Sequence, residues 1–271
     1  MTLVVTDLDG TLWGRDCIAG PATRAAVAEL RAAGHPVLAA TARRPRGARE
    51  LLAANALPLP LVGLNGAVGE RPDGTRFHAA HFAPEAAARA LAAFTAHRLA
   101  PCVYVLERDV DVVLPPVPST HPGHQASLAG VVRTADPAAV IAAQPVFAFS
   151  VLGRPEERLR PTATALEAEG FGFDLAPEPV WPDWGLTVMA PGISKWAGVV
   201  AYCAEVGEDP AAVLAVGDNS NDLPLLRAAA WPLTVAGSRA AALLPAAPTI
   251  PPPAAQGWAE LPALLRRRAA A

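Results

Sequence analysis

A short apolar run that ends in two carboxylates opens the chain and constrains its fold most. Leu3–Thr6 is apolar and rich in β-branched residues, which predicts a buried strand, and Asp7 and Asp9 follow it directly. Residues i and i+2 of an extended chain point to the same side, so we expect both carboxylates to project together. Two like charges at that distance need a cation between them or a proton on one of them. Mg²⁺, which prefers oxygen ligands, is the cation that this pattern favours.

Two other interpretations of these acids can be compared with the metal site. Asp-x-Asp-Gly also occurs as plain turn chemistry, because Asp and Gly both favour turns. A calcium-binding loop would need Gly at its sixth position and Glu at its twelfth, counted from Asp7. Leu12 and Ile18 stand there, and a strand rather than a helix comes first, so the calcium loop is excluded. The plain turn stays open when Asp7 and Asp9 are considered alone.

Apolar strands and amphipathic helices alternate at both ends of the chain. Strands are expected at 3–6, 36–40 and 59–62, with helices at 21–33 and 45–54 between them. After residue 190 the pattern returns, with a helix at 194–206, a strand at 212–216, a helix at 221–229, a strand at 233–235, and helices at 238–243 and 258–268. Short connections between such elements predict a parallel sheet that is covered on both faces.

The intervening stretch has a different pattern. A hairpin at 68–77 precedes it, and it contains a hairpin at 103–114, strands at 146–152, 171–176, 180–181 and 186–190, and helices at 84–98, 136–143 and 155–169, with a loop at 115–130. Hairpins that alternate with helices predict an antiparallel α+β insert. We therefore expect a core domain made of residues 1–80 and 190–271, interrupted by an inserted domain at 81–189.

Polar residues follow several of the predicted parallel strands. In an open parallel sheet, ligands bind outside the carboxyl ends of the strands. Asp7 and Asp9 follow the first strand, Thr41 the second, and Asp218 the strand after the insert. Asp222 lies near a helix start, where acids are favoured in any case. Lys195 also opens a helix, which is an unfavourable place for a cation and favours a counter-anion nearby; without such an anion, a solvated surface lysine is the default.

Composition excludes several classes of protein. The 271 residues are 52% hydrophobic and 17% charged, so the chain can bury a sizeable core, and its net charge of −3 gives no footprint for nucleic acid. The one basic cluster, Arg266–Arg268, suits a helix C-terminus. Three distant cysteines, Cys17, Cys102 and Cys203, fit no metal or disulfide framework, and no signal peptide or membrane span is expected. A cytoplasmic protein that does not bind membranes is the expectation, and composition assigns no oligomeric state.

The motifs together resemble the haloacid dehalogenase superfamily, and more narrowly its Cof-type phosphatases with a type IIB cap. Asp7-Leu8-Asp9-Gly10-Thr11 is similar to the first family motif, Thr41 in Thr41-Ala42-Arg43-Arg44-Pro45 to the second, Lys195 in Gly192-Ile193-Ser194-Lys195 to the third, and Gly217-Asp218-Asn219-Ser220-Asn221-Asp222 to the fourth. Asn65-Gly66-Ala67 also resembles a stretch usual in the Cof branch. Ala42 departs from the usual glycine, while the Thr41 hydroxyl remains. The resemblance implies an α/β fold with a Rossmann-like core and an inserted α+β cap.

The resemblance also implies the roles of the matching residues. Asp7 is expected to form an aspartyl-phosphate as nucleophile, with Asp9 as general acid and base. Thr41, Lys195 and Asn221 are expected to bind the phosphate of a small-molecule ester, with a sugar phosphate as the family expectation. The cofactor implied is Mg²⁺, held by Asp7, the Asp9 main-chain carbonyl and Asp218, with Asp222 as a ligand or as a partner of the ligands.

The cap residues and the alternatives are less constrained by the sequence. His121, His124 and Gln125 lie in the predicted polar loop, and we expect them, like Arg43 and Arg44, to be solvated rather than to contact substrate. Trp181 and Trp184 suit a cap core and a substrate wall equally well. A phosphotransferase or phosphomutase on the same scaffold remains an alternative, as does a regulatory or binding protein without turnover. A phosphorylated-aspartate receiver is disfavoured by the insert and by Asp9.

Overall fold

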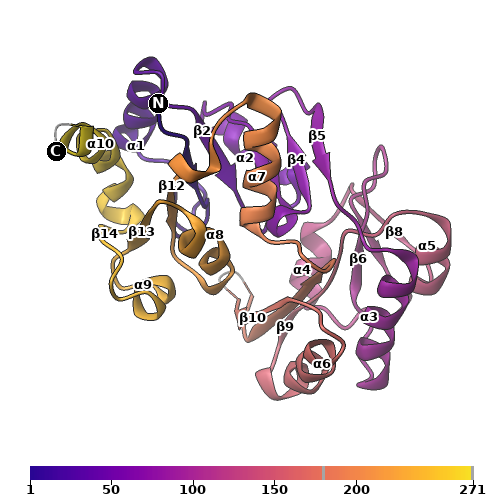
Figure 1. Cartoon of the computed structure of the whole chain (residues 1–271). Helices are drawn as coiled ribbons and strands as arrows, with labels where there is room; N and C mark the ends of the chain where they lie inside the picture. Colours follow the sequence, from indigo (N-terminus) through magenta and orange to yellow (C-terminus); the bar gives the residue numbers. More distant parts are fainter. Residues whose placement is uncertain (179–180, 270–271) are drawn as a thin grey trace. The chain divides into compact units, whose positions relative to one another are not determined.

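The computed structural model describes residues 1–178 and 181–269 and divides the chain into two units. The first, here called the core unit, comprises Met1–Ala79 and Ser194–Ala271. The second, here called the insert unit, comprises Ala80–Ile193. Figure 1 shows both units and their elements.

The core unit is organised around an eight-stranded sheet with the strand order β14-β13-β12-β1-β2-β3-β4-β5. All neighbours from β14 to β3 pair in parallel, and β4 and β5 add an antiparallel hairpin at one edge. The strands are β1 (Val4–Thr6), β2 (Val37–Ala40), β3 (Leu61–Gly63), β4 (Val68–Glu70), β5 (Arg76–Ala79), β12 (Leu214–Gly217), β13 (Trp231–Val235) and β14 (Thr249–Ile250). Strand β1 therefore lies in the middle of the sheet, between β2 and β12.

Helices cover both faces of this sheet. The helices are α1 (Pro21–Ala32), α2 (Pro45–Ala54), α7 (Lys195–Val206), α8 (Leu223–Ala228), α9 (Arg239–Leu243) and α10 (Leu261–Ala269). One apolar cluster joins α1, α2 and α10 to alternate strand residues such as Val4 and Val37, and a second joins α7, α8 and α9 to the intervening ones, such as Val5 and Leu38. The side chains of successive strand residues point to opposite faces, so continuous apolar runs fill both cores. The apolar segments of the sequence therefore form a central parallel sheet, as expected.

Short 3₁₀ turns complete the core unit. They are η1 (Leu64–Gly66), η2 (Pro210–Ala212), η3 (Ser220–Asp222), η4 (Pro253–Ala255) and η5 (Gly257–Glu260). The helix expected at 221–229 begins as the turn η3 and continues as α8. The helix expected at 258–268 likewise begins as the turn η5 and continues as α10. The sequence does not predict strand β14, because two residues between prolines carry too little pattern to indicate a strand.

The insert unit has a six-stranded sheet with helices α3, α5 and α6 packed on it. The strand order is β10-β11-β9-β6-β7-β8, antiparallel except for the parallel pair β7 and β8. Its elements are α3 (Pro84–Ala96), β6 (Cys102–Tyr104), β7 (Val112–Leu114), α4 (Pro122–Ser127), β8 (Val132–Thr134), α5 (Pro137–Ala143), β9 (Ala148–Arg154), α6 (Glu156–Ala168), β10 (Phe173–Pro177) and β11 (Trp184–Met189). Phe94, Phe149 and Leu186 are among the residues that form its apolar core.

The insert unit differs from the sequence expectation in three places. Helix α4 lies within 115–130, which was expected to be a loop, because Pro122 at its first position and the His121 cap start a single short helix there. Strand β8 was not expected, because none of its residues is fully buried and they show no apolar alternation. Of the expected strand at 180–181, Val180 lies outside the described residues and Trp181 lies in a bend. The α/β class with an α+β insert is confirmed.

Candidate active site

The first feature of the site is a buried lysine held between two carboxylates of the core unit. Lys195 Nζ lies 2.6 Å from Asp7 Oδ1 and 2.6 Å from Asp222 Oδ1. The lysine side chain is 1% exposed, and those of Asp7 and Asp222 are 8% and 0% exposed. Charged groups at such burial persist only when they are paired and hydrogen-bonded. Lys195 stands at the start of a helix, which is an unfavourable place for a cation. The Asp7 carboxylate is a counter-anion that compensates for this position.

Strand topology explains why Asp7 and Asp218 are neighbours. Thr6 pairs with Val216 across β1 and β12, and the Asp7 amide continues the ladder to the Val216 carbonyl over 2.9 Å. Asp218, the residue after β12, accepts a 2.9 Å hydrogen bond from the Thr11 hydroxyl. Gly10 has a φ of +82°, and a Cβ there would lie 2.4 Å from an Asp218 oxygen. The sharp turn at Gly10 thus lets the loop after β1 pass directly beside the Asp218 carboxylate.

Asp222 holds the loop after β12 in place. Its Oδ2 accepts hydrogen bonds from the backbone amides of Asp218 and Asn219, each over 3.0 Å. Its other oxygen is bound to Lys195, so both oxygens have partners. An Asp222 carboxylate with this set of donors orients Lys195 and the Asp218 loop together.

Asp9 points into a different set of partners. Arg43 binds both oxygens of Asp9, Nε to Oδ2 over 2.6 Å and Nη2 to Oδ1 over 2.7 Å. The indole Nε1 of Trp13 donates to Oδ1 over 3.0 Å. Arg43 also lies 3.1 Å from the Cys17 sulfur. The expectation of a solvated Arg43 is wrong, because this arginine is a bidentate partner of Asp9 and not a free loop residue.

Three further polar residues surround the carboxyl ends of β2 and β3. Thr41 follows β2, is buried, and its hydroxyl accepts a 3.1 Å hydrogen bond from the Arg43 amide. Asn65 follows β3 in a left-handed conformation with a φ of 52°, and its amide donates to the Thr41 carbonyl over 3.0 Å. Asn221 Nδ2 donates to Asn65 Oδ1 over 2.9 Å. Asn221 is thereby linked to the ends of β2 and β3.

Two glycines allow α7 to approach the turn η1 closely. A Cβ on Gly66, where φ is +110°, would lie 1.9 Å from the Ser194 carbonyl oxygen. A Cβ on Gly198 would lie 2.2 Å from Val62 Cγ1 and 3.0 Å from the Gly66 carbonyl oxygen. Ser194 caps the helix by accepting from the Ala197 amide. The first turn of α7, which carries Lys195, is therefore seated against the backbone of η1.

The electrostatics of the site follow from three acids gathered around one lysine. Burial raises the pKa of Asp7 well above its usual value, and the charges of Asp222 and Asp218 add to this against the opposing effect of Lys195. Burial, together with the charge of Asp222, raises the pKa of Asp218 to about 6. Burial would lower the pKa of Lys195, but Asp222 and Asp7 outweigh it and raise this pKa. The site has an excess of buried negative charge.

The donor set of the acids suits a hard divalent cation. One oxygen from each of Asp7, Asp218 and Asp222 lies within 4.8 Å of the other two. Carboxylate oxygens are the ligands that Mg²⁺ prefers, and a second cation would offset the charge that Lys195 leaves uncompensated. The residues present therefore fit Mg²⁺. The Asp9 side chain does not belong to this cluster, because Arg43 and Trp13 bind it.

The cap candidates form a hydrogen-bonded group within the insert unit. His124 is buried, with Nδ1 2.8 Å from the Thr120 hydroxyl, and Gln125 donates to the Thr120 carbonyl. His121 caps α4 and stacks on Trp181, with ring centroids 5.7 Å apart. The expectation of a solvated loop residue is therefore wrong for His124, which is buried. His121 and Gln125 contact other residues of the insert unit. Trp184 packs against the insert core.

Sequence reasoning did not assign Trp13, Arg43, Gly66 or Gly198 to the site. Arg43 stands two residues after Thr41, and this spacing was a usable signal. Gly198 lies one turn after Lys195 in a helix, where glycine is unfavourable and suggests a packing requirement. Trp13 gave no signal, because its contact with Asp9 depends on the turn between them.

Comparisons with known proteins agree with this architecture. The family model for haloacid dehalogenase-like hydrolases matches residues 4–257. A haloacid dehalogenase-like hydrolase from Bacillus subtilis superposes with a TM-score of 0.80 at 17% identity, covering 96% of this chain and 98% of that one. BT1666 from Bacteroides thetaiotaomicron, a phosphatase of the same superfamily, superposes with a TM-score of 0.77 at 18% identity, covering 96% of this chain and 93% of that one. The subclass IIB sugar phosphatase BT4131 superposes with a TM-score of 0.74 at 18% identity, covering 96% of this chain and 97% of that one. Comparison with curated protein sequences gave no match.

The fold and the family model together define the class of protein. The chain belongs to the haloacid dehalogenase-like hydrolase family. It is therefore a hydrolase with an α/β core and an inserted α+β unit. None of the helices in the described ranges 1–178 and 181–269 combines the length and apolarity that a membrane crossing requires.

Proposed function

We propose that this hydrolase is a Mg²⁺-dependent phosphatase that acts on a small phosphate ester, with a sugar phosphate as its substrate class. The observation that carries the proposal is the buried Asp7 carboxylate, which Lys195 orients over 2.6 Å beside Asp218. Acids and a cation at the carboxyl ends of parallel strands suit an anionic substrate. The substrate class follows the fold neighbour BT4131, which is a sugar phosphatase.

Asp7 is the proposed nucleophile. A carboxylate oxygen of Asp7 attacks phosphorus in line, the ester P–O bond breaks, and an aspartyl-phosphate forms. Water then attacks phosphorus and the acyl-phosphate P–O bond breaks. This step regenerates the Asp7 carboxylate and releases inorganic phosphate. Lys195 holds Asp7 in one orientation, and its remaining N–H is the proposed donor to a phosphoryl oxygen.

Asp9 is the proposed general acid and base. It gives a proton to the leaving alkoxide in the first step and takes one from the attacking water in the second. Arg43 and Trp13 fix its carboxylate by three hydrogen bonds, which keeps it apart from the Asp7 and Asp218 carboxylates. Thr41, which follows β2, and Asn221 of the turn η3 complete the proposed phosphate-binding set.

The proposed ligands of Mg²⁺ are Asp7, Asp218 and the main-chain carbonyl of Asp9. When bound, the cation supplies charge that offsets the repulsion between the Asp7 carboxylate and the phosphate. Asp222 belongs to the same oxygen cluster, but both of its oxygens already accept hydrogen bonds. We therefore assign Asp222 the role of positioning Lys195 and the Asp218 loop.

The test is release of inorganic phosphate from a panel of sugar phosphates and other phosphometabolites, with Mg²⁺ and with chelator. We expect release from a few esters in Mg²⁺ and loss of activity in chelator. Asp7→Asn should abolish turnover in a folded protein, whereas Asp16→Asn, which alters an exposed acid near the same strand, should retain it. Turnover by Asp7→Asn would contradict the nucleophile, and phosphate appearing on a second hydroxyl instead of in solution would indicate a phosphotransferase.

A further inference from the structure

A cavity of about 590 Å³ lies in the core unit at the end of the sheet opposite the carboxylates. Thr2 precedes β1, Val213 precedes β12 and Trp231 begins β13, and all three line the cavity. Asp7 and Asp218, in contrast, follow the last residues of β1 and β12. The cavity is therefore distinct from the candidate active site. Its volume falls within the range of sites for small ligands.

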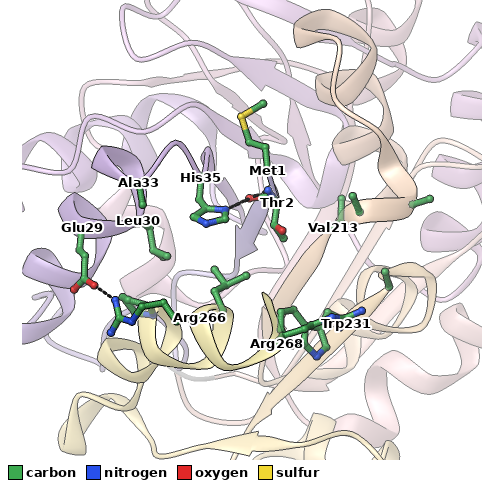
Figure 2. A pocket seen from close by; sticks show the side chains of 15 residues that line it. Met1, Thr2, Glu29, Leu30, Ala33, His35, Val213, Trp231, Arg266 and Arg268 are labelled. Carbon is green, nitrogen blue, oxygen red and sulfur yellow. Dashed lines mark hydrogen bonds and ion pairs between the residues drawn. The ribbon is translucent and has the colours of Figure 1, made fainter. Parts of the chain in front are cut away.

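Much of the wall is apolar. The accessible apolar residues of the wall are Ala33, Ala230 and Trp231, whereas Leu30, Val213 and Leu265 also line it but are buried in the core. Figure 2 shows the side chains around it, with His35 between α1 and the start of β1. The Thr2 amide donates to His35 Nδ1 over 3.2 Å, which fixes the imidazole in the wall. An apolar surface of this kind accepts the hydrocarbon part of a ligand.

Two arginines of α10 give the cavity its charge. Arg266 pairs with Glu29, the only acid among the described residues that line the cavity. Arg268 has no ion pair with a carboxylate in the described part of the chain, and its guanidinium carbon lies 3.9 Å from the centroid of the Trp231 ring. Figure 2 shows both pairs. The charged side chains of the wall thus leave one positive charge, on Arg268.

The position of its guanidinium carbon over the Trp231 ring leaves Arg268 able to bind an anion. A guanidinium that stacks on an aromatic ring uses its planar face, while its N–H donors lie at its edge. Those donors match a carboxylate in a bidentate geometry. The aromatic surface also restricts the side chain, which lowers the entropy that is lost on binding.

We propose that this cavity binds a small monoanion with an apolar body, an aryl or alkyl carboxylate. The hydrocarbon part packs on Trp231, Ala33 and Ala230, the apolar lining residues that are accessible, and the carboxylate is bound by Arg268. The cationic cluster that the sequence explains by the helix dipole thus has a second role at one of its residues. Arg267, between the two arginines, does not line the cavity.

The probe is 1-naphthoate, titrated into the full chain by isothermal calorimetry, with neutral 1-naphthamide as the matched compound. Mg²⁺ and inorganic phosphate are present throughout, so that the candidate active site does not take up the probe. We expect one site with a Kd of about 1 mM or tighter for naphthoate, and at least tenfold weaker binding of naphthamide.

Variants locate the binding. Arg268→Ala should weaken naphthoate at least tenfold, while Arg267→Ala, the matched control on the same helix, should bind as the original chain does. Ala33→Phe, which adds a ring at an exposed residue of the wall, should block the cavity without disturbing α10. Equal binding by Arg268→Ala and Arg267→Ala, equal affinity for naphthamide, or no binding up to about 10 mM would each overturn the proposal. Circular dichroism and melting temperature check that each variant is folded.

Discussion

Arg43 binds both carboxylate oxygens of Asp9, over 2.6 and 2.7 Å, and thereby joins the loop after β2 to the loop after β1. The two side chains are about one-third exposed, so the pair meets water on one side. The geometry is bidentate, the arrangement in which arginine and carboxylate orient each other best. Because Asp9 is the proposed general acid, Arg43 is expected to act by positioning it.

Replacement of Arg43 tests this positioning role. Arg43→Ala should lower kcat roughly 10- to 100-fold with little change in KM, because a misplaced general acid impairs chemistry more than binding. The loss should be larger for alkyl phosphates than for p-nitrophenyl phosphate, whose leaving group needs little protonation. Arg43→Lys, which keeps the charge but not the planar fork, should recover part of the rate.

The matched control for Arg43 is Arg31→Ala, an exposed arginine in the last turn of α1. Its steady-state parameters should equal those of the original chain. A loss in Arg43→Ala that is equal for both kinds of leaving group, or that appears only in KM, would show that Arg43 binds substrate or stabilises the fold and does not position Asp9.

Asp222→Asn should destabilise the core unit strongly. The change removes a buried negative charge from Lys195, and loss of one partner of a buried pair costs about 3–5 kcal/mol. Urea unfolding measures the loss, with Asp109→Asn, an exposed hairpin acid, as the control expected to change little. Unfolding midpoints that agree between these two variants would contradict the structural role of Asp222.

Gly198→Ala should displace the first turn of α7. Its Cβ would lie 2.2 Å from Val62 Cγ1 and 3.0 Å from a backbone oxygen, and overpacking of this kind costs about 1–3 kcal/mol. Because Lys195 lies one turn earlier, we expect reduced phosphatase activity together with a lower melting temperature.

Gly172→Ala is the matched control for this change, since no heavy atom lies within 4 Å of its Cβ position. It should leave both activity and melting temperature unaltered. Full activity and an unchanged melting temperature in Gly198→Ala would mean that neither activity nor stability depends on the close packing of α7 against η1.

The insert unit should show a pH-dependent stability that arises from Glu178. Burial, with the charge of Asp174, raises the pKa of Glu178 from 4.5 to about 7. A carboxyl whose pKa is raised by folding contributes stability below its unfolded pKa and loses it as the pH rises through the folded pKa. The side chain is partly exposed, so we expect a loss of about 1 kcal/mol between pH 4.5 and pH 8.

Glu178→Gln, which is neutral throughout, should abolish this part of the pH dependence. The melting temperature measured from pH 4.5 to pH 8 should then fall less than in the original chain. Glu167→Gln, at an exposed position of α6, serves as the control and should follow the original curve. A Glu178→Gln curve parallel to that of the control would show that Glu178 titrates as an ordinary surface acid.

The periodic parts of the sequence predicted the fold well. Helix α2 was expected at 45–54 and occurs at Pro45–Ala54, because proline at its first position and a regular apolar face determine it locally. Strands such as β12 were equally clear, since a run of apolar residues has few alternatives to burial. Helix α4 and strands β8 and β14 were missed, because two to six residues carry too little pattern and depend on contacts distant in sequence.

The sequence pattern is enough to predict that the acids and the hydroxyl after the parallel strands lie together, because topology places the ends of such strands at one edge. The pairing of these groups follows from the packing of the folded chain. Asp9 is bound to Arg43 and Trp13, whereas Asp222 is shared between Lys195 and two loop amides. Such pairing depends on glycines that let backbones approach and on side chains that meet across more than 180 residues, as Lys195 and Asp7 do. The physical reason is that a sequence pattern encodes the direction of a side chain, while its partner is set by the packing of whole elements.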